Sequence, residues 1–545
     1  MLKNITKKIY IKDWLRLKPY ERQTSTDLYY LRLSNEVKEA LMFYEEELLQ
    51  KIDLSNEEIN ELACLITSYF EDLVSGTNIW NSFVRMHHGM YGKPLPFYWS
   101  DDYFEEEINL EDVRFLMWYY LNTIQDEIVL PPQTEFIMGA SAEVMDVFEE
   151  AWENAPENTQ LLPYYQIDPE EKDFYQVREL IGTVLFNSYL FHPDTGFRLA
   201  EEVFDILEEH GNLDRLGAYL TQVQDTTLHA AHTQLLSKKG NEWTAEILGS
   251  DHPLSNDIRN MSPKIEGFFL YKGRDETHLF IEHIASGKQF RMLKESYDGY
   301  ELLAEVDTMA YLGIVKWKGE WWFSGISTIT AFEADTVLDE KNSVKSRMQV
   351  NFLDEGEKMD EILEGQFEAF KAFNNGSQIA FMQAEKLESF LTDCTNYTNG
   401  TLNLSDKEHE EALQRSKYDG LTDGMDTTHI KYDDSAQMCL VFFNPKGGIE
   451  MAFGMNHAFP LPNNPAFNLE DDETDVFPLL YSDEFSTELA LFCINNCKDR
   501  LPFFTEGLGR DLLPDLDFLL RFWKRRFYHT KPEITLVGKE NSGFE

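Results

Sequence analysis

The segment Ile314-Val-Lys-Trp-Lys-Gly-Glu-Trp-Trp-Phe323 decides the fold of the middle of this chain. Two apolar runs flank a two-residue Lys318-Gly319 turn, which is the pattern of a tight β-hairpin. Period-two alternation extends outward from this hairpin over segments 266–272, 277–284, 288–293, 302–307, 310–317 and 320–330. Short strands this closely spaced predict a small β-barrel of the SH3-like or OB-like kind.

Both faces of this hairpin are apolar, whereas a solvated hairpin would alternate apolar and polar residues. Directly opposed residues share a face, so one face carries Val315, Trp317 and Trp322, and the other carries Ile314, Lys316, Trp321 and Phe323. We expect the barrel core to cover the first face, with Trp322 inside. We expect a neighbouring domain or a partner to cover the second. Lys316, Trp321 and Phe323 are therefore the candidate partner-binding residues, with Lys316 stacked on Trp321.

The half of the chain before the barrel is predicted to be mainly helical. Ser55 and Glu58 form a capping box ahead of apolar residues at helical spacing. Further helices are predicted after Asn109 and over 140–154, 171–189, 196–209 and 213–238. After residue 336 helical patterns mix with a second hairpin around Asn-Pro-Lys-Gly-Gly at 444–448. The fold class is therefore α+β, with a helical domain at 1–260, a barrel-like module at 262–335 and an α+β domain at 336–545.

The charge of the chain limits the partners it would attract. The sequence carries 97 Asp and Glu against 48 Lys and Arg, a formal net charge of −49, while 14% of its residues are Phe, Trp or Tyr. The aromatic content predicts a folded protein, and the charge opposes direct binding to nucleic acid or to an anionic membrane. Basic groups gather near both ends, within the first 22 residues and from Arg521 onward. We expect them to pair with the acidic body, within one molecule or between subunits.

Several features favour a cytoplasmic setting. The opening MLKNITKKIYIKDWLRLKPY lacks the apolar core of a secretory signal, and no apolar run is long enough to span a membrane. The five cysteines are Cys64, Cys394, Cys439, Cys493 and Cys497. Their odd number and the lack of a CxxC pair predict reduced, buried thiols.

Familiar catalytic signatures are missing from the sequence. Gly507-Leu-Gly509 lacks the third glycine of a dinucleotide-binding loop, and no phosphate-binding P-loop or GxSxG elbow occurs. His409-Glu410 lacks the second histidine of a zincin helix, because Leu413 occupies that position. The acidic loop from Asp419 to Asp426 lacks the spacing of a calcium loop, so a solvated turn is favoured there. No cofactor is predicted.

One group of residues is a candidate metal site. Asp225, His229 and His232 lie at positions i, i+4 and i+7 of the predicted helix 213–238, so they share one face. Two histidines and a carboxylate would suit zinc or iron with open coordination positions. The alternative is a solvated surface, because the apolar stripe of this helix (Leu216, Leu220, Val223 and Thr227) lies roughly opposite. We favour the solvated surface.

Fragments over most of the chain carry a family resemblance: Lys8-Ile-Tyr-Ile-Lys-Asp-Trp-Leu, Lys18-Pro-Tyr, Thr26-Asp-Leu-Tyr-Tyr-Leu, Leu33-Ser-Asn-Glu-Val, Glu111-Asp-Val-Arg-Phe-Leu-Met-Trp and Gly319-Glu-Trp-Trp. With these fragments the chain resembles an uncharacterised bacterial domain-of-unknown-function family from Bacteroidetes. The resemblance implies a bacterial cytosolic setting. It implies no activity, cofactor or catalytic residue.

Three hypotheses of function remain open at the level of sequence. The favoured one is a non-catalytic cytosolic interaction or accessory protein that engages a protein partner, or a second copy of itself, through the aromatic barrel face and acidic surface. The second is a metal-assisted hydrolase built around Asp225, His229 and His232. The third is a nucleic-acid-related protein that binds through the barrel and the basic ends, or mimics nucleic acid through its acids.

Overall fold

The structure is a computed structural model that describes residues 8–98, 100, 102–125, 129–210, 216–343, 350, 356–401, 405, 407, 438–469 and 472–532. The chain divides into two compact units. The first comprises Met1–Lys264 together with Gly313–Ile326, and the second comprises Ile265–Leu312 together with Ser327–Glu545. The predicted α+β fold class, with a helical N-terminal half, a barrel in the middle and a mixed C-terminal region, is confirmed.

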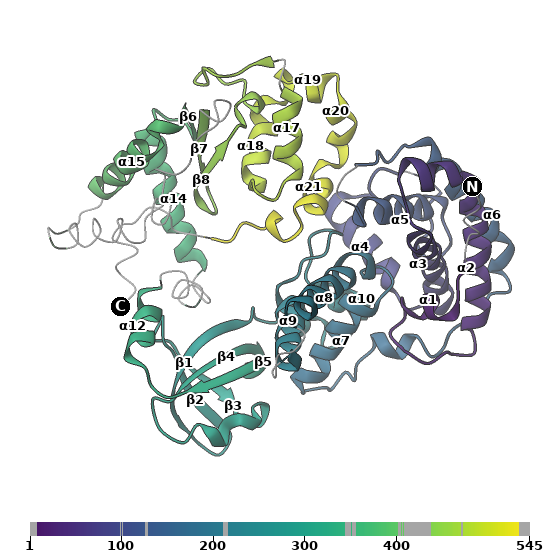
Figure 1. Ribbon diagram of the computed structural model, residues 1–545, viewed down its shortest axis with the longest axis horizontal. Coiled ribbons are helices and arrows are strands. Elements are labelled where there is room, and N and C mark those ends of the chain that lie inside the picture. The colour runs from purple at the N-terminus through teal and green to yellow at the C-terminus, as the bar shows by residue number, and fades with distance from the viewer. Residues whose placement is uncertain are drawn as a thin grey trace. The chain divides into compact units, whose positions relative to one another are not determined.

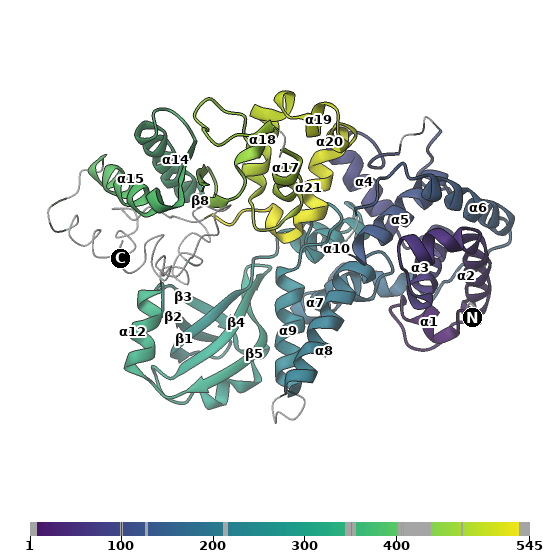
Figure 2. The same cartoon turned by 45° about the horizontal axis from the view of Figure 1, so that its top comes forward.

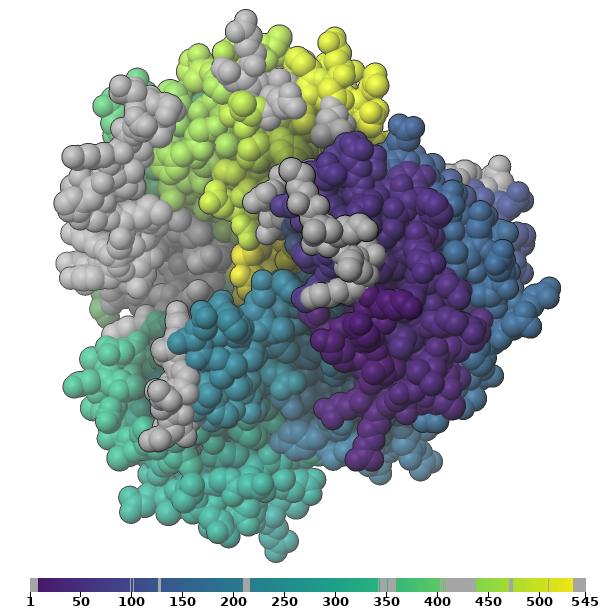
Figure 3. All heavy atoms as spheres, turned by 45° about the vertical axis from the view of Figure 1, so that its right-hand side comes forward, coloured from purple at the N-terminus to yellow at the C-terminus, as the bar shows by residue number. Residues whose placement is uncertain are grey.

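The helical unit is the purple-to-blue part of Figure 1. Its helices are α1 (Ile11–Leu15), α2 (Asp27–Leu41), α3 (Asn56–Ser75), α4 (Ile79–Tyr91), α5 (Leu110–Thr123), α6 (Glu135–Trp152), α7 (Phe174–Asn187), α8 (Phe197–His210), α9 (Leu216–Ala230), α10 (Gly240–Leu248) and α11 (Ser255–Arg259). In the space-filling view of Figure 3, the purple and blue atoms of this unit form one continuous surface.

Helix α3 is buried along most of its length and begins where the sequence predicts. The Ser55 hydroxyl accepts a hydrogen bond from the Glu58 amide at 3.2 Å, and the Glu58 carboxylate accepts one from the Ser55 amide at 2.6 Å. This confirms the predicted capping box. Its apolar residues from Ile59 to Phe70 are 0% exposed. Because α3 is apolar on nearly every side, neighbouring helices must surround it.

The basic N-terminal segment pairs with acids of the same helical unit. The buried Lys18 ammonium forms an ion pair with the buried Glu71 carboxylate and donates to the Ser68 hydroxyl at 3.0 Å. It also lies 3.7 Å from the centre of the Trp14 ring, in a cation–π contact. Lys18 of this basic end therefore pairs with an acid within one molecule, as expected.

The barrel consists of five strands that close in the order β1-β2-β3-β5-β4. The strands are β1 (Ile265–Arg274), β2 (His278–His283), β3 (Gln289–Leu293), β4 (Met309–Trp317) and β5 (Glu320–Thr330). Because β5 and not β4 neighbours β3, the order is the Greek-key arrangement of an OB-like barrel. Strands β2 and β3 bury alternate residues, as period-two patterning requires.

The predicted strand at 302–307 is wrong. The chain there passes from the short 3-10 helix Asp298–Leu302 into a turn, and strand β4 begins only at Met309. Asp307 adopts a left-handed backbone conformation with φ of 69°, which reverses the chain. The Asp307 amide then donates a hydrogen bond of 2.7 Å to the Tyr271 carbonyl, and the Tyr271 amide donates one of 2.9 Å to the Thr308 carbonyl, which fixes this turn against β1.

The C-terminal region is built around a three-stranded antiparallel sheet. Its order is β6 (Ile379–Gln383), β7 (Met438–Asn444) and β8 (Gly448–Phe453). Alternate residues of β7 enter two separate cores. Cys439, Val441 and Phe443 pack with helices α14 (Gly356–Phe373) and α15 (Leu387–Thr401). Leu440 and Phe442 pack with helices α17 (Asp472–Tyr481), α18 (Thr487–Cys497) and α21 (Leu516–Lys524). Helices thus cover both faces of the sheet (Figure 1), which explains why β7 is apolar without alternation.

The remaining helices are α12 (Ala334–Asn342), α19 (Pro502–Thr505) and α20 (Leu508–Leu512). No helix in the described part of the chain combines the length and the apolar character that crossing a bilayer requires. The acidic loop at 419–426 and the His409-Glu410 pair lie outside the described residues.

Candidate functional site

The structure brings together two of the three residues predicted as a metal site. Helix α9 ends at Ala230, eight residues before the predicted end at 238. His232 therefore lies beyond the helix, where its backbone pairs with that of Lys239. Asp225 and His229 remain on one face of α9. Among the described residues, no group of three His, Cys, Asp or Glu side chains is arranged to hold a metal ion.

Asp225 is the centre of a buried ion cluster. One carboxylate oxygen, Oδ1, lies 2.7 Å from Arg178 Nη2 on α7, and the other, Oδ2, lies 2.8 Å from Lys264 Nζ just before β1. The Ser324 hydroxyl on β5 also donates to Oδ1, at 2.7 Å. Asp225 is 0% exposed. We call Asp225, Arg178, Lys264, His229 and Ser324 the Asp225 cluster.

His229 completes this cluster through Ser324. Its Nε2 atom lies 3.0 Å from the Ser324 hydroxyl oxygen and 3.8 Å from Asp225 Oδ1. Because the Ser324 proton is given to Asp225, the neutral His229 ring must donate from Nε2 to the Ser324 oxygen. The His229 ring also stacks on Phe174, with centroids 6.3 Å apart and planes 11° apart. His229 is therefore held by both polar and aromatic contacts.

The charges of the cluster follow from its burial. Burial alone would raise the pKa of the Asp225 carboxyl, but His229, Lys264 and Arg178 together hold that pKa below its ordinary value. Burial lowers the pKa of His229 to about 4, although the nearby Asp225 carboxylate opposes this shift. At neutral pH the cluster therefore contains one carboxylate, two cations and a neutral imidazole.

This geometry does not match that of a nucleophilic or metal-binding centre. In a catalytic triad the serine donates to the histidine, and the histidine donates to the carboxylate through its other nitrogen. Here Asp225 Oδ1 lies 3.8 Å from Nε2, the same ring nitrogen that faces Ser324, so Asp225 does not orient His229 through its other nitrogen as a triad carboxylate does. The oxygens of Asp225 already face two cations and a hydroxyl, which compete with any metal ion.

The expectation that this face of α9 is solvated is wrong. The His229 side chain is only 8% exposed, because strand β5 covers it. Figure 2 shows β5 beside α9. Gly325 allows β5 to approach α9 closely. A Cβ atom at this position would lie only 2.7 Å from Gln222 Oε1 and 2.9 Å from Asp225 Oδ2, which is too close. Its φ of +90° also favours glycine. The cluster therefore fastens the Gly313–Ile326 hairpin segment to helices α7 and α9.

We expect His229 to make the protein less stable in acid. Its pKa of about 4 in the folded protein lies below the ordinary 6.5, so the unfolded chain binds the proton first as the pH falls. Stability is then lost between about pH 6.5 and 4, by about 3 kcal/mol from this residue. Urea unfolding of the wild type and of His229→Gln at several pH values measures the difference.

The other buried histidines with a pKa lowered to about 4 are His87, His192 and His283. They are present in both proteins, so they cancel in this comparison. Equal pH dependence of the wild type and His229→Gln would contradict the assignment of a neutral, buried His229.

Aromatic contacts also fasten the hairpin. The Trp317 indole donates to the Lys172 carbonyl at 3.1 Å, and the Trp322 ring lies 6.1 Å from Phe174 and 6.0 Å from Tyr175. The first face of the hairpin thus packs on the start of α7. The prediction that it faces the barrel core is wrong, but Trp322 is buried, with 9% exposed.

The candidate partner-binding residues lie on the second face. Lys316 is exposed, and its ammonium lies 5.9 Å from the centre of the Trp321 ring, so the predicted stacking of these two side chains is confirmed. Trp321 and Phe323 are partly buried. The Phe323 carbonyl accepts a hydrogen bond from the Tyr175 hydroxyl at 3.0 Å, which holds β5 in place.

Comparison with known proteins identifies the family. Residues 8–312 match the family described as "Protein of unknown function (DUF3843)", and this span is more than half of the 545-residue chain. The chain belongs to this family. The DUF3843 match covers the described helices α1–α11 and the first three barrel strands, and it ends within β4. No curated protein and no solved structure matches the chain.

Sequence reasoning missed three members of the cluster: Arg178, Lys264 and Ser324. They lie on separate elements, and no fixed spacing links them to Asp225. Helix α2 was also missed, although Tyr30, Leu33 and Val37 keep helical spacing and are buried.

Proposed function

We propose that this DUF3843 protein is a non-catalytic interaction or accessory protein of the bacterial cytoplasm. It engages a protein partner, or a second copy of itself, through Lys316, Trp321 and Phe323 and through its acidic surface. The observation that carries the proposal is the Lys316–Trp321 pair. An exposed ammonium over a partly buried indole, on a hairpin fastened by the Asp225 cluster, is a rigid contact surface.

The electrostatics support a protein partner over a nucleic acid. The net charge of −49 repels phosphate backbones, and it attracts basic protein surfaces. The metal-assisted hydrolase gains no support from the geometry, because Asp225 is enclosed by cations and His232 lies apart from it.

The cytoplasmic setting is supported by the cysteines, since all five are free and buried. We expect thiol titration of the denatured protein, without reductant, to find every cysteine reactive. The reason is that a reducing compartment maintains unpaired thiols. Recovery of a disulfide, for example between Cys493 and Cys497, would contradict this setting.

The proposed function is tested by affinity purification of tagged full-length protein from its host. We expect a protein partner in stoichiometric amount, lost when Lys316→Ala and Trp321→Ala are combined. Lys318→Ala is the matched control, because Lys318 is also an exposed hairpin lysine but its ammonium is bonded to the Glu171 carbonyl at 2.9 Å. A partner that the double variant retains in full would overturn the proposed surface.

A further inference from the structure

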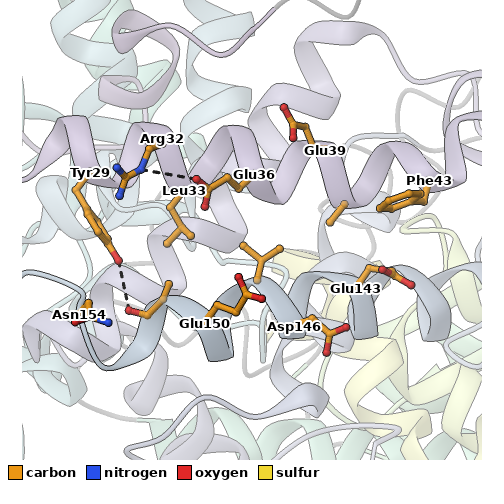
Figure 4. A pocket seen from close by; sticks show the side chains of 13 residues that line it. Tyr29, Arg32, Leu33, Glu36, Glu39, Phe43, Glu143, Asp146, Glu150 and Asn154 are labelled. Atoms are coloured by element: carbon orange, nitrogen blue, oxygen red, sulfur yellow. Dashed lines mark hydrogen bonds and ion pairs between the residues drawn. The ribbon is translucent and has the colours of Figure 1, made fainter.

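A groove runs between helices α2 and α6 on the helical unit. It has a volume of about 550 Å³ and is lined by residues of both helices. The helices are antiparallel, since the Tyr29 hydroxyl near the start of α2 donates to the Ala151 carbonyl near the end of α6, at 3.4 Å. Figure 4 shows this contact at one end of the groove and Phe43, just past α2, at the other.

The walls of this groove are acidic on both sides. The carboxylates that line it are Glu36, Glu39, Glu143, Asp146 and Glu150. Among the described residues that line it, Arg32 is the only basic one, and it pairs weakly with Glu36 at 3.7 Å. The other four carboxylates form no ion pair with any residue that the structure describes. Like charges gathered without compensation are unfavourable, and a cationic occupant relieves their repulsion.

The groove also has apolar parts. Leu33 and Ala40 form its floor and are 3% and 5% exposed, and Val147 contributes from α6. Figure 4 shows Leu33 pointing from α2 toward α6. Phe43 is 76% exposed, which makes it the most exposed large apolar side chain among the described residues. An occupant therefore meets acidic edges, an apolar floor of which Leu33 and Ala40 expose little and Val147 more, and one exposed aromatic side chain at the end.

The two helices that form the groove are held firmly from behind. The Phe148 ring on α6 lies 4.7 Å from the Phe70 ring on the central helix α3. The Tyr30 hydroxyl on α2 donates to the Pro156 carbonyl at 2.6 Å, just after α6. At the other end, the rings of Tyr44 and Phe136 lie 6.0 Å apart. The groove is thus formed before anything binds, which reduces the entropy lost on binding.

We propose that the α2/α6 groove binds an amphipathic helical segment of a partner protein that is rich in Lys and Arg. The acids recur at helical spacing along both walls, so cations flanking an apolar stripe would meet carboxylates on either side. The 15 residues of α2 extend over about 22 Å, which matches an occupant of about four helical turns. This inference rests on the proposed function, and it adds the chemistry of the partner and a second surface.

The test uses the full-length chain and a designed peptide. The probe is a fluorescein-labelled peptide of about 18 residues with an apolar stripe of Leu and Phe and with Lys at its flanking positions. A peptide with Glu in place of each Lys is its control. Fluorescence polarisation measures the affinity in low salt, about 50 mM, and again at about 500 mM, where screening weakens surface charge contacts.

Two variants with equal charge change separate the groove from the overall field. Glu36→Gln/Glu143→Gln/Glu150→Gln alters the groove, whereas Glu201→Gln/Glu202→Gln/Asp205→Asn alters exposed acids on α8. We expect the groove variant to bind the Lys peptide about tenfold more weakly and the α8 variant to change affinity less than about twofold. Phe43→Ala is expected to weaken binding several-fold without changing the salt dependence.

The outcomes distinguish this inference from the proposed function. Equal losses in the two charge variants, or no binding of the Lys peptide to the wild type, would overturn the groove inference. The affinity purification of Lys316→Ala/Trp321→Ala decides the proposed function separately, because those residues lie outside the groove. The wild type could capture a partner that the Lys316→Ala/Trp321→Ala variant loses, while the groove variant binds the Lys peptide as tightly as the wild type does. These two results together would support the proposed function and refute the groove inference.

Discussion

Replacing Asp225 with alanine is expected to lower the free energy of unfolding by about 3–5 kcal/mol. The Asp225 carboxylate is 0% exposed and faces Arg178 at 2.7 Å and Lys264 at 2.8 Å. Its removal leaves the nearly buried Lys264 ammonium, with 6% of its side chain exposed, without the carboxylate partner. The Ser324 hydroxyl also loses its acceptor, so β5 loses a contact to α9. Urea unfolding at neutral pH measures the loss.

Two control variants show whether the loss of stability comes from the ion pairs of the Asp225 cluster. Asp205→Ala removes an exposed acid from α8 and is expected to change stability by less than about 0.5 kcal/mol. Combining Asp225→Ala with Lys264→Met removes both partners of one ion pair. We expect the double variant to be less destabilised than the sum of the single variants. A loss below about 1 kcal/mol for Asp225→Ala would show that the cluster does not fasten the hairpin.

Trp322→Ala is expected to cost about 3–5 kcal/mol, as for a large side chain removed from a packed interior. Trp322 is 9% exposed and packs against Phe174 and Tyr175. Trp321→Ala should cost less than half as much, because Trp321 is partly buried and its ring lies beneath the exposed Lys316 ammonium. Thermal and urea unfolding of the two variants compare them directly.

Partner binding should be reduced more by Trp321→Ala than by Trp322→Ala, which is the opposite of the order expected for stability. Trp321→Ala is expected to reduce partner capture at a temperature where the variant remains folded, since cation–π and aromatic contacts dominate such surfaces. If Trp321→Ala destabilises the protein as severely as Trp322→Ala, that face of the hairpin belongs to the interior and is not a binding surface.

Local patterns in the sequence predicted much of the fold. The Lys318-Gly319 turn placed β4 and β5 within one residue of their observed bounds, and the Ser55/Glu58 capping box placed the start of α3. The turn and the capping box each depend only on residues close together in the sequence, so a short segment is enough to predict them. The strand at 302–307 was predicted wrongly because alternation says nothing about the left-handed turn at Asp307.

The candidate site was predicted less well, because its geometry depends on distant segments. Helical periodicity extended α9 to 238, but Leu236 and Ser237 adopt positive φ values of 59° and 50°, and the chain turns back there. His232 was consequently assigned to the wrong element. Asp225 appeared solvated because its cations come from α7 and from the residue before β1, and no local pattern reveals that they converge.

The Asp225 cluster fastens the hairpin, and we propose that it does not form a metal-dependent active site. Elemental analysis of purified full-length protein tests it most directly. We expect no stoichiometric transition metal, because Asp225 is enclosed by Arg178, Lys264 and Ser324. About one zinc or iron per chain, lost in His229→Ala, would contradict this proposal and favour a metal-assisted enzyme.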